Sequence, residues 1–283
     1  MKRSSEADLS GKRVLITGAA RGVGAALAQR LHERGAHVAL IGLEGELLRE
    51  VAARCGDAPW AECNVVVSTQ VDEAVEAMVG RLGGLDIVVA NAGIAAQLPL
   101  IGGDPAVMER TLSVNVLGTY YTLRAAGPHI SHPGGYALAV ASLAAAVHAP
   151  LLGAYSASKA AVEALGNTLR VELRQSGAKV GVAYFAELDT DMTSRGFGTE
   201  AASKLVKSGR VAPLSVGIDA VERGIARRAR RVVAPGWVGA ILPIRMLVQR
   251  VVDVAAQRGL RDALRIARDE NAPLTTPQPE PKP

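Results

Sequence analysis

A tyrosine and a lysine stand four positions apart in this sequence, at Tyr155 and Lys159, and Ser142 lies upstream of both. In a helix, this spacing places both side chains on one face, so both can reach the same cleft. A phenol with a pKa of about 10 is a poor base at neutral pH, but a neighbouring ammonium group favours its ionised form. Tyr155 could therefore act as a general acid/base, while the Ser142 hydroxyl holds a carbonyl or alcohol oxygen.

A tyrosine and a lysine one helical turn apart are more often an ordinary surface pair. Other motifs must therefore decide whether this pair is catalytic. The strongest of these is the glycine-rich run Thr17-Gly18-Ala19-Ala20-Arg21-Gly22-Val23-Gly24, which follows a short apolar run and precedes a helix-length segment. Its glycines permit a tight turn, and the helix N-terminus offers free N–H groups to a pyrophosphate. An ordinary strand-to-helix loop can also carry such glycines, which makes the motif weak by itself.

Short apolar runs alternate with longer amphipathic segments along the first two-thirds of the chain. The runs, which are too short for helices and rich in branched residues, are 14–16, 37–41, 87–90, 136–141, 180–184 and 232–234. The helix-length segments include 24–34, 68–82 and 155–175, each followed closely by a glycine. This alternation predicts an α/β fold with a doubly wound parallel sheet, the Rossmann fold, of about seven strands with helices on both faces.

No internal repeat or linker divides the main body of the sequence. We therefore expect residues 1–270 to form a single dinucleotide-binding catalytic domain with a C-terminal helical extension at about 237–268. Residues 271–283 are rich in proline and polar groups, and we expect them to form a disordered tail.

Composition argues against several other classes of protein. Lys and Arg number 32 against 27 Asp and Glu, and this net charge of +5 is too small to indicate a nucleic-acid-binding protein. Cys55 and Cys63 predict neither a disulfide framework nor a zinc or other metal site. The N-terminus lacks the apolar region of a secretory signal, so we expect a cytoplasmic protein. Residues 134–154 carry no Asp, Glu, Lys or Arg, but their glycines and Pro150 favour a strand, a loop and a helix start over a membrane span.

The spacing Thr-Gly-x-x-x-Gly-x-Gly resembles that of the short-chain dehydrogenase/reductase family, and the later motifs follow in that family's order over about residues 10–235. They are Asn91-Ala92-Gly93 after the fourth strand, Asn115 in a predicted helix, Ser142 after the fifth strand, and Tyr155 with Lys159. The resemblance implies an oxidoreductase that uses NAD or NADP. Its catalytic residues would be Asn115, Ser142, Tyr155 and Lys159, with Asn115 holding a water that connects Lys159 to solvent.

The same resemblance implies a set of cofactor-binding residues, and a homodimer or homotetramer. The set is Gly18, Arg21, Gly22, Val23, Gly24, Asn64, Val65, Asn91, Ala92, Gly93, Tyr155, Lys159, Leu188 and Thr190. Two positions depart from the family pattern. Phe185-Ala186 replaces the usual Pro-Gly after the sixth strand, which leaves the geometry of that loop open. Asn64 replaces an aspartate that faces the adenine amino group, and its amide oxygen can still accept that bond.

The choice between NAD and NADP depends on the end of the second strand, where NAD-preferring enzymes carry an acidic residue. Gly42 occupies that place here, and Arg21 could pair with the 2′-phosphate of NADP. Glu44, two positions on, could instead replace the missing carboxylate, and Arg21 could be a plain turn residue. The sequence favours NADP only slightly.

The residues around Tyr155 predict an apolar pocket wall. Leu143 to Val147, Ala149, Leu151 and Leu152 are nearly all apolar, which favours a hydrophobic secondary alcohol or ketone as substrate. His148 in this loop could touch the substrate but is more typical of a solvent-facing loop histidine. Two other functions stay open: a related redox step such as enoyl reduction, and a non-catalytic cofactor-binding scaffold or sensor. The complete set of catalytic side chains argues against the scaffold.

Residues 237–256 alternate apolar side chains with Arg245 and Arg250 in a pattern that predicts one amphipathic helix. Its apolar face needs a cover. The cover could be the protein's own body or a sister subunit, the mouth of the substrate pocket, or a membrane surface. Packing on protein is the favoured alternative, and contact with a membrane is the less favoured one.

Overall fold

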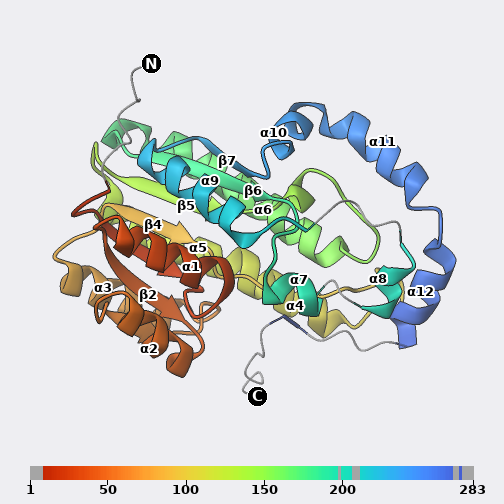
Figure 1. Cartoon of the computed structure of the whole chain (residues 1–283), viewed down its shortest axis with the longest axis horizontal. Coiled ribbons are helices and arrows are strands. Elements are labelled where there is room, and N and C mark those ends of the chain that lie inside the picture. The colour runs from red at the N-terminus through yellow and green to blue at the C-terminus, as the bar shows by residue number, and fades with distance from the viewer. Residues whose placement is uncertain (1–8, 197–198, 206–210, 270–273, 276–283) are drawn as a thin grey trace.

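Seven parallel strands form one sheet in the order β3-β2-β1-β4-β5-β6-β7 (Figure 1). The structure is a computed structural model that describes residues 9–196, 199–205, 211–269 and 274–275. The strands are β1 (Arg13–Thr17), β2 (His37–Gly42), β3 (Trp60–Glu62), β4 (Ile87–Ala90), β5 (Tyr136–Val140), β6 (Lys179–Phe185) and β7 (Arg231–Ala234). The predicted doubly wound sheet is confirmed.

Helices cover both faces of the sheet, which explains why its strands are almost uniformly apolar. The helices over one face are α1 (Gly22–Glu33), α2 (Gly45–Arg54) and α9 (Leu214–Ala226). Those over the other face are α3 (Ser68–Leu82), α5 (Gly118–Ile130) and α6 (Gly153–Glu172). Successive strand residues such as Leu15 and Ile16 belong to opposite cores, and both are fully buried.

The strand order reverses at β1, which lies between β2 and β4. In a doubly wound sheet, such a reversal opens a crevice at the carboxyl ends of the strands. The shorter elements around this end are α4 (Pro105–Leu112), a π-helical turn (Ser113–Leu117), a 3-10 turn (Leu143–Ala145), α7 (Asp191–Gly196) and α8 (Glu200–Ser203). A second 3-10 turn, Leu173–Ser176, follows α6 at the opposite end of that helix.

The prediction of one continuous amphipathic helix over residues 237–256 is wrong, because the segment is interrupted. The segment forms α10 (Val238–Ile241), a 3-10 turn (Leu242–Ile244) and α11 (Arg245–Ala255), and α12 (Leu260–Asp269) follows. Pro243 lies in the 3-10 turn, where its missing N–H and fixed φ interrupt the helical ladder. The break lets the chain turn away from the sheet, so that α11 and α12 form the outer edge seen at the right of Figure 1.

The predicted disordered tail, residues 271–283, lies outside the described residues except for Leu274 and Thr275. Thr275 is 2% exposed, and its N–H donates to the carbonyl of Ala95 over 3.1 Å. Its hydroxyl accepts a bond from the N–H of Ala95 over 3.0 Å. Thr275 is thus held by the loop that follows β4, and the disorder expected of the tail stays a prediction.

The uncharged stretch 134–154 forms β5, the 3-10 turn and the start of α6, as predicted. In the part of the chain that the structure describes, no helix combines the length and the apolar character needed to cross a bilayer.

Candidate active site

A cavity of about 400 Å³ opens at the carboxyl ends of β1, β4, β5 and β6. It brings together fourteen of the sixteen predicted site residues: Gly18, Arg21, Gly22, Val23, Asn64, Val65, Asn91, Ala92, Gly93, Ser142, Tyr155, Lys159, Leu188 and Thr190. The two that do not line it are Gly24 and Asn115, which lie directly behind its wall.

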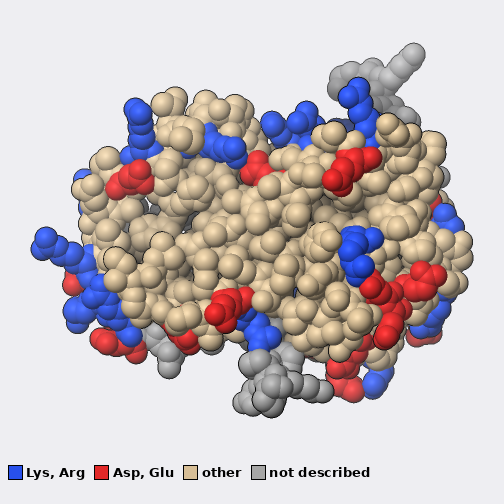
Figure 2. All heavy atoms as spheres, turned by 180° about the vertical axis from the view of Figure 1, so that it is seen from behind, with Lys and Arg blue, Asp and Glu red and all other residues tan. Residues whose placement is uncertain are grey.

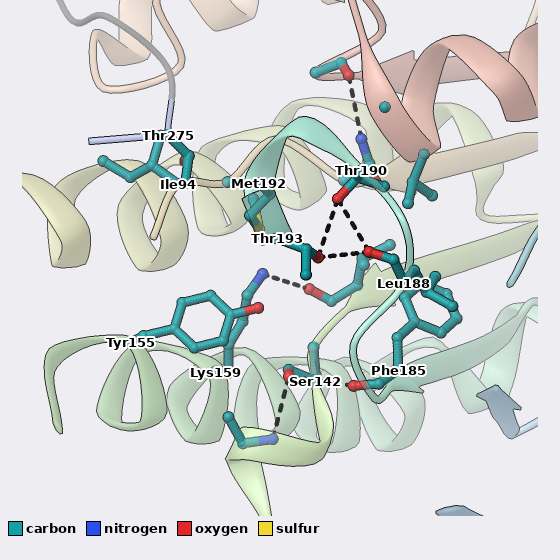
Figure 3. Close-up of a pocket in the computed structure, with 18 of the residues that line it drawn as sticks. Ile94, Ser142, Tyr155, Lys159, Phe185, Leu188, Thr190, Met192, Thr193 and Thr275 are labelled. Carbon is teal, nitrogen blue, oxygen red and sulfur yellow. Dashed lines mark hydrogen bonds between the residues drawn. The ribbon is translucent and has the colours of Figure 1, made fainter. Parts of the chain in front are cut away.

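Tyr155 and Lys159 lie one turn apart on α6 and point toward the same end of the cavity (Figure 3). Tyr155 is 7% exposed and Lys159 is 4% exposed. The Lys159 ammonium lies 5.7 Å from the centre of the Tyr155 ring and donates to the carbonyl of Val140 over 2.9 Å. The side chains therefore share one desolvated space, as their spacing predicts.

Burial shifts the pKa values of Tyr155 and Lys159 in the directions that favour the uncharged form of each group. Desolvation lowers the pKa of Lys159 to about 8. It raises the pKa of Tyr155, and a hydrogen bond with Ser142 acts in the opposite direction. A lysine that titrates near neutral pH beside a phenol is suited to proton transfer, because small changes in the site can move the proton.

Ser142 follows β5 and caps the 3-10 turn, since its hydroxyl accepts from the N–H of Ala144 over 3.1 Å. The same hydroxyl donates to the carbonyl of Phe185 over 3.3 Å (Figure 3). The bond to Phe185 links the end of β5 to the end of β6, and the two bonds together fix the serine beside Tyr155. A substrate oxygen at this point would lie within reach of both hydroxyls.

Asn115 is fully buried in the π-helical turn between α4 and α5. Its amide oxygen accepts from the N–H of Ile94 over 2.8 Å, and its amide nitrogen donates to the carbonyl of Ile94 and to Ser158, each over 2.9 Å. Ser158 in turn donates to the backbone carbonyl of Tyr155 over 2.7 Å. The side chain thus ties the loop after β4 to α6, and its predicted water-holding role stays a prediction.

The glycine-rich turn uses backbone conformations and close approaches that favour glycine. Gly18 and Gly22 have φ values of +66° and +55°, and a side chain at Gly24 would meet the carbonyl oxygen of Gly18 at 2.2 Å. The side chain of Arg21, the N-cap residue of α1, forms no capping bond with the first N–H groups of this helix. Asn91 holds the turn in place by donating to the carbonyls of Thr17 and Gly18 over 3.0 and 3.2 Å.

The glycine of Asn91-Ala92-Gly93 is required by the close approach of two catalytic candidates. A side chain at Gly93 would meet the amide oxygen of Asn115 at 3.2 Å and the nitrogen of Lys159 at 3.3 Å.

The adenosine end of the cavity carries charged side chains. Gly42 ends β2 against Leu48, so the usual acidic residue is absent there. Arg21 forms a two-pronged ion pair with Glu44, one bond of which measures 2.7 Å, and contacts Asp191 at 3.2 Å. The hydrogen bond with Glu44 is the main reason that the pKa of Arg21 is raised. The sequence pointed to Arg21 and Glu44 as alternatives, and the structure pairs them with each other.

The loop after β6 keeps a defined path without the family's Pro-Gly. The N–H of Ala186 donates to the carbonyl of Ala234 over 2.9 Å, and a backbone bridge joins Leu188 to Ala212. The Thr190 hydroxyl bonds to Leu188 and Thr193 over 3.4 Å each. Thr190 therefore lines the cavity with its hydroxyl engaged locally. Asn64 is similarly engaged, since its side chain accepts from the N–H of Val66 over 3.3 Å.

Leu143, Ala144, Val147, Ala149 and Leu152 of the predicted apolar wall line the cavity. Residues 237–256 contribute to it too, as one of the covers considered for that segment implies, but other lining residues were not predicted. The additional apolar or small lining residues include Ile94, Met192, Thr193, Trp237, Ile241, Val248, Val252 and Thr275. The apolar periodicity of residues 237–256 was a signal for Ile241, Val248 and Val252. Nothing local in the sequence marks Thr275. His148 is exposed and uses its backbone N–H and carbonyl to bind Gln249, in agreement with a solvent-facing loop histidine.

The sequence matches the short chain dehydrogenase family over residues 12–201. The chain belongs to this family. Short-chain dehydrogenases are oxidoreductases that use a nicotinamide nucleotide, so this chain is an oxidoreductase of that type.

Two relatives illustrate the range of named short-chain dehydrogenases that the chain resembles. It is 30% identical over 268 residues to 11-beta-hydroxysteroid dehydrogenase-like 6 of Arabidopsis thaliana, a match that covers 88% of this chain and 77% of the relative. It is 32% identical over 212 residues to D-threitol dehydrogenase of Mycolicibacterium smegmatis, covering 72% and 82%.

Two solved short-chain dehydrogenase structures superimpose on most of the chain. A short-chain type dehydrogenase/reductase from Mycobacterium marinum gives a TM-score of 0.71 at 26% identity, and a dehydrogenase/reductase from Sinorhizobium meliloti 1021 gives 0.72 at 26%. Each match covers 82% of this chain and 97% of the solved chain.

Proposed function

We propose that the chain interconverts a hydrophobic ketone and the corresponding secondary alcohol, with Tyr155 as general acid/base. The observation that carries this proposal is the convergence of Tyr155, Lys159 and Ser142 at one end of a cavity whose other end is the glycine-rich turn. A bound nicotinamide would supply the hydride for reduction and accept it in the reverse reaction.

The side chains of the protein would then manage the proton and the charge on the substrate oxygen. In reduction, the Tyr155 hydroxyl gives its proton to the ketone oxygen as the carbonyl carbon gains hydride. The Ser142 hydroxyl donates a hydrogen bond to the same oxygen and stabilises its developing negative charge. The Lys159 ammonium stabilises the phenolate left on Tyr155, and the proton is later regained from solvent.

The cofactor choice that we propose is NAD, against the slight preference for NADP that the sequence gives. Arg21 already faces two carboxylates, those of Glu44 and Asp191. A 2′-phosphate would have to displace them or lie beside their negative charge. The Glu44 carboxylate, in contrast, can accept hydrogen bonds from the ribose hydroxyls of NAD.

The apolar wall supports a hydrophobic substrate. Val147, Leu152, Met192, Trp237, Ile241, Val248 and Val252 all line the cavity, and the polar groups cluster near Tyr155 and near Arg21. The homodimer or homotetramer implied by the family stays a prediction, which sedimentation velocity would check.

A substrate panel tests the proposed function directly. Oxidation of the reduced cofactor would be followed by its absorbance with ketones of increasing alkyl length and with an enoyl thioester. Reduction of the oxidised cofactor would be followed in the same way with a four-carbon polyol. We expect kcat/KM to rise with alkyl length and the thioester to be inert. Turnover of the polyol or the thioester alone would overturn the proposal.

A further inference from the structure

Helix α11 has two faces with different surroundings. On the inner face, Val248 and Val252 line the cavity. Gln249 accepts from the N–H of His148 over 2.7 Å and donates to its carbonyl over 3.0 Å. Arg245 contacts Glu163 of α6 at 3.2 Å. This face packs on protein, as the sequence favours.

The outer face is apolar and uncovered. Leu247, Val251 and Val254 follow one another at intervals of four and three residues, which aligns them along one side of α11. Ile244 precedes them as the last residue of the 3-10 turn. Leu247 is 61% exposed, and Val251 and Val254 are each 69% exposed. No residue of α11 is buried. Single exposed apolar residues are normal, but a continuous row of them marks a binding surface.

The chain is rich in arginine from α11 onward, and Arg250 is the helical neighbour of Leu247 and Val254 in the apolar row. From residue 245 to residue 269 the chain carries Arg245, Arg250, Arg258, Arg261, Arg265 and Arg268 against Asp253, Asp262 and Asp269. Within the described part of the chain, no salt bridge is formed by Arg250, Arg258, Arg261 or Arg268. Figure 2 shows basic side chains gathered at the edge of the molecule that α11 and α12 occupy.

Charge and area favour a lipid surface over a second copy of the chain. An eleven-residue helix is about 16 Å long, and its row of four side chains covers far less than the roughly 800 Å² per partner of a stable dimer. Anionic phosphates would instead pair with the arginines while the acyl region covers the apolar row.

We propose that α11 lies in the headgroup layer of an anionic phospholipid surface, with Ile244, Leu247, Val251 and Val254 directed toward the acyl chains. The contact is peripheral, because a helix of this length cannot span the roughly 30 Å hydrocarbon core. The same helix lines the cavity with Val248 and Val252, so surface binding would place the substrate wall beside the lipid. Only this last consequence rests on the proposed function.

Co-sedimentation of the full chain with vesicles tests the proposal. The probes are vesicles of phosphatidylcholine alone and of phosphatidylcholine mixed with phosphatidylglycerol in equal parts. We expect binding to the mixed vesicles that weakens with salt, and little binding to phosphatidylcholine. Val251→Asp should weaken binding to the mixed vesicles at least about tenfold, since it puts a charge into the acyl boundary.

The matched control is Val171→Asp, because Val171 is a similarly exposed valine, 72% exposed, at the far end of α6. It should leave vesicle binding unchanged. Arg250→Gln together with Arg258→Gln should weaken binding to the mixed vesicles about thirtyfold, because each arginine near an anionic surface contributes about 1 kcal/mol. Reduced-cofactor fluorescence, measured on every variant without vesicles, should show unchanged cofactor binding.

Two results would overturn the proposal. One is a wild-type chain that stays in solution with the mixed vesicles. The other is a wild-type oligomer that Val251→Asp converts to a smaller species, which would assign the row to a second copy. If the wild-type chain bound vesicles as expected but did not turn over ketones, the proposed function would be wrong and the proposal that α11 binds a lipid surface would stand.

Discussion

Tyr155 and Lys159 on α6 have little in common with Val248 and Val252 on α11, although both pairs line the same cavity. The first pair is buried at the junction of a long helix and the central strands, and its polar partners are core residues. The second pair comes from a helix without a single buried residue. The proposed proton transfer would therefore lie on the buried scaffold, and the proposed substrate contacts would extend to the periphery.

This division has a physical reason. Proton transfer requires a fixed distance and a low dielectric, and both come from a well-packed core. A substrate wall only has to be apolar and of suitable shape, so a helix held by a few side-chain contacts is sufficient. The four predictions below test each region, in order of decreasing expected effect.

The largest effect should come from Tyr155→Phe, which keeps the ring and removes the transferable proton. Turnover should fall at least about 100-fold, the lower range for a lost general acid/base, while folding and cofactor binding persist. Steady-state kinetics and cofactor fluorescence measure the two effects. Tyr184→Phe is the matched control, since Tyr184 is a buried tyrosine of β6 away from the cavity. Wild-type turnover by the Tyr155 variant would remove this residue from the mechanism.

Lys159→Met should make the chain more stable and nearly inactive, which would show that the buried ammonium group of Lys159 serves activity at a cost in stability. The pKa of Lys159 is lowered from 10.5 to about 8 in the folded chain, so the unfolded chain binds more protons between these values. Stability contributed by this position therefore rises with pH from about 8 to 10.5 and is least below 8. At pH 7 the variant should be more stable by about 1–3 kcal/mol, and nearly inactive.

Urea unfolding of both proteins at several pH values checks this prediction. Cys55 and Cys63 have raised pKa values of about 11, so their own contribution to stability falls as the pH rises from 9 toward 11. Those thiols are present in both proteins, and the difference between the two stability curves isolates Lys159. A variant that is less stable than the wild type at pH 7 would show that the ammonium stabilises the fold.

The two regions also differ in how far the sequence could predict them. Ser142, Tyr155 and Lys159 were predictable because strand ends and helical spacing are local properties, and the family motifs mark the same positions. Pro243 could have predicted the break before α11, but the apolar periodicity on both sides of it suggested one helix. Thr275 could not be placed, because its partner Ala95 lies 180 residues earlier and polar composition alone indicated disorder.

Ion pairs at the adenosine end show the same limit. The sequence identified Arg21 and Glu44 as separate alternatives, because nothing local tells whether two side chains 23 residues apart meet. Asp191 was missed as a partner of Arg21, since it comes from α7 after the sixth strand. Contacts of this kind depend on how the finished sheet brings the ends of its strands together.

A smaller effect is expected from Glu44→Gln, which removes the carboxylate but keeps the shape. It should lower affinity for NAD relative to NADP by roughly tenfold, because a ribose partner is lost and Arg21 is released for a 2′-phosphate. Dissociation constants for the two cofactors measure the ratio. Glu46→Gln is the control, since Glu46 is exposed and pairs with Arg49 outside the cavity. A ratio that stays constant, or that moves toward NAD, would contradict the assignment of Glu44.

The smallest effect should come from the periphery, where adjacent valines on α11 provide an internal comparison. Val252 lines the cavity, whereas Val251 lies in the exposed apolar row on the outer face of α11. Val252→Ala removes the two γ-methyl groups. Each fully buried carbon contributes about 0.8 kcal/mol, and Val252 is only partly buried, so KM for a long-chain ketone should rise about threefold to fivefold. The value of kcat should stay constant, because a wall contact of this kind is equally strong in the bound substrate and in the transition state. Val251→Ala, assayed without vesicles, should leave KM unchanged. Equal effects of the two substitutions would mean that α11 influences the site through its own stability, whereas a fall in kcat for Val252→Ala would make this helix part of the machinery that positions Tyr155.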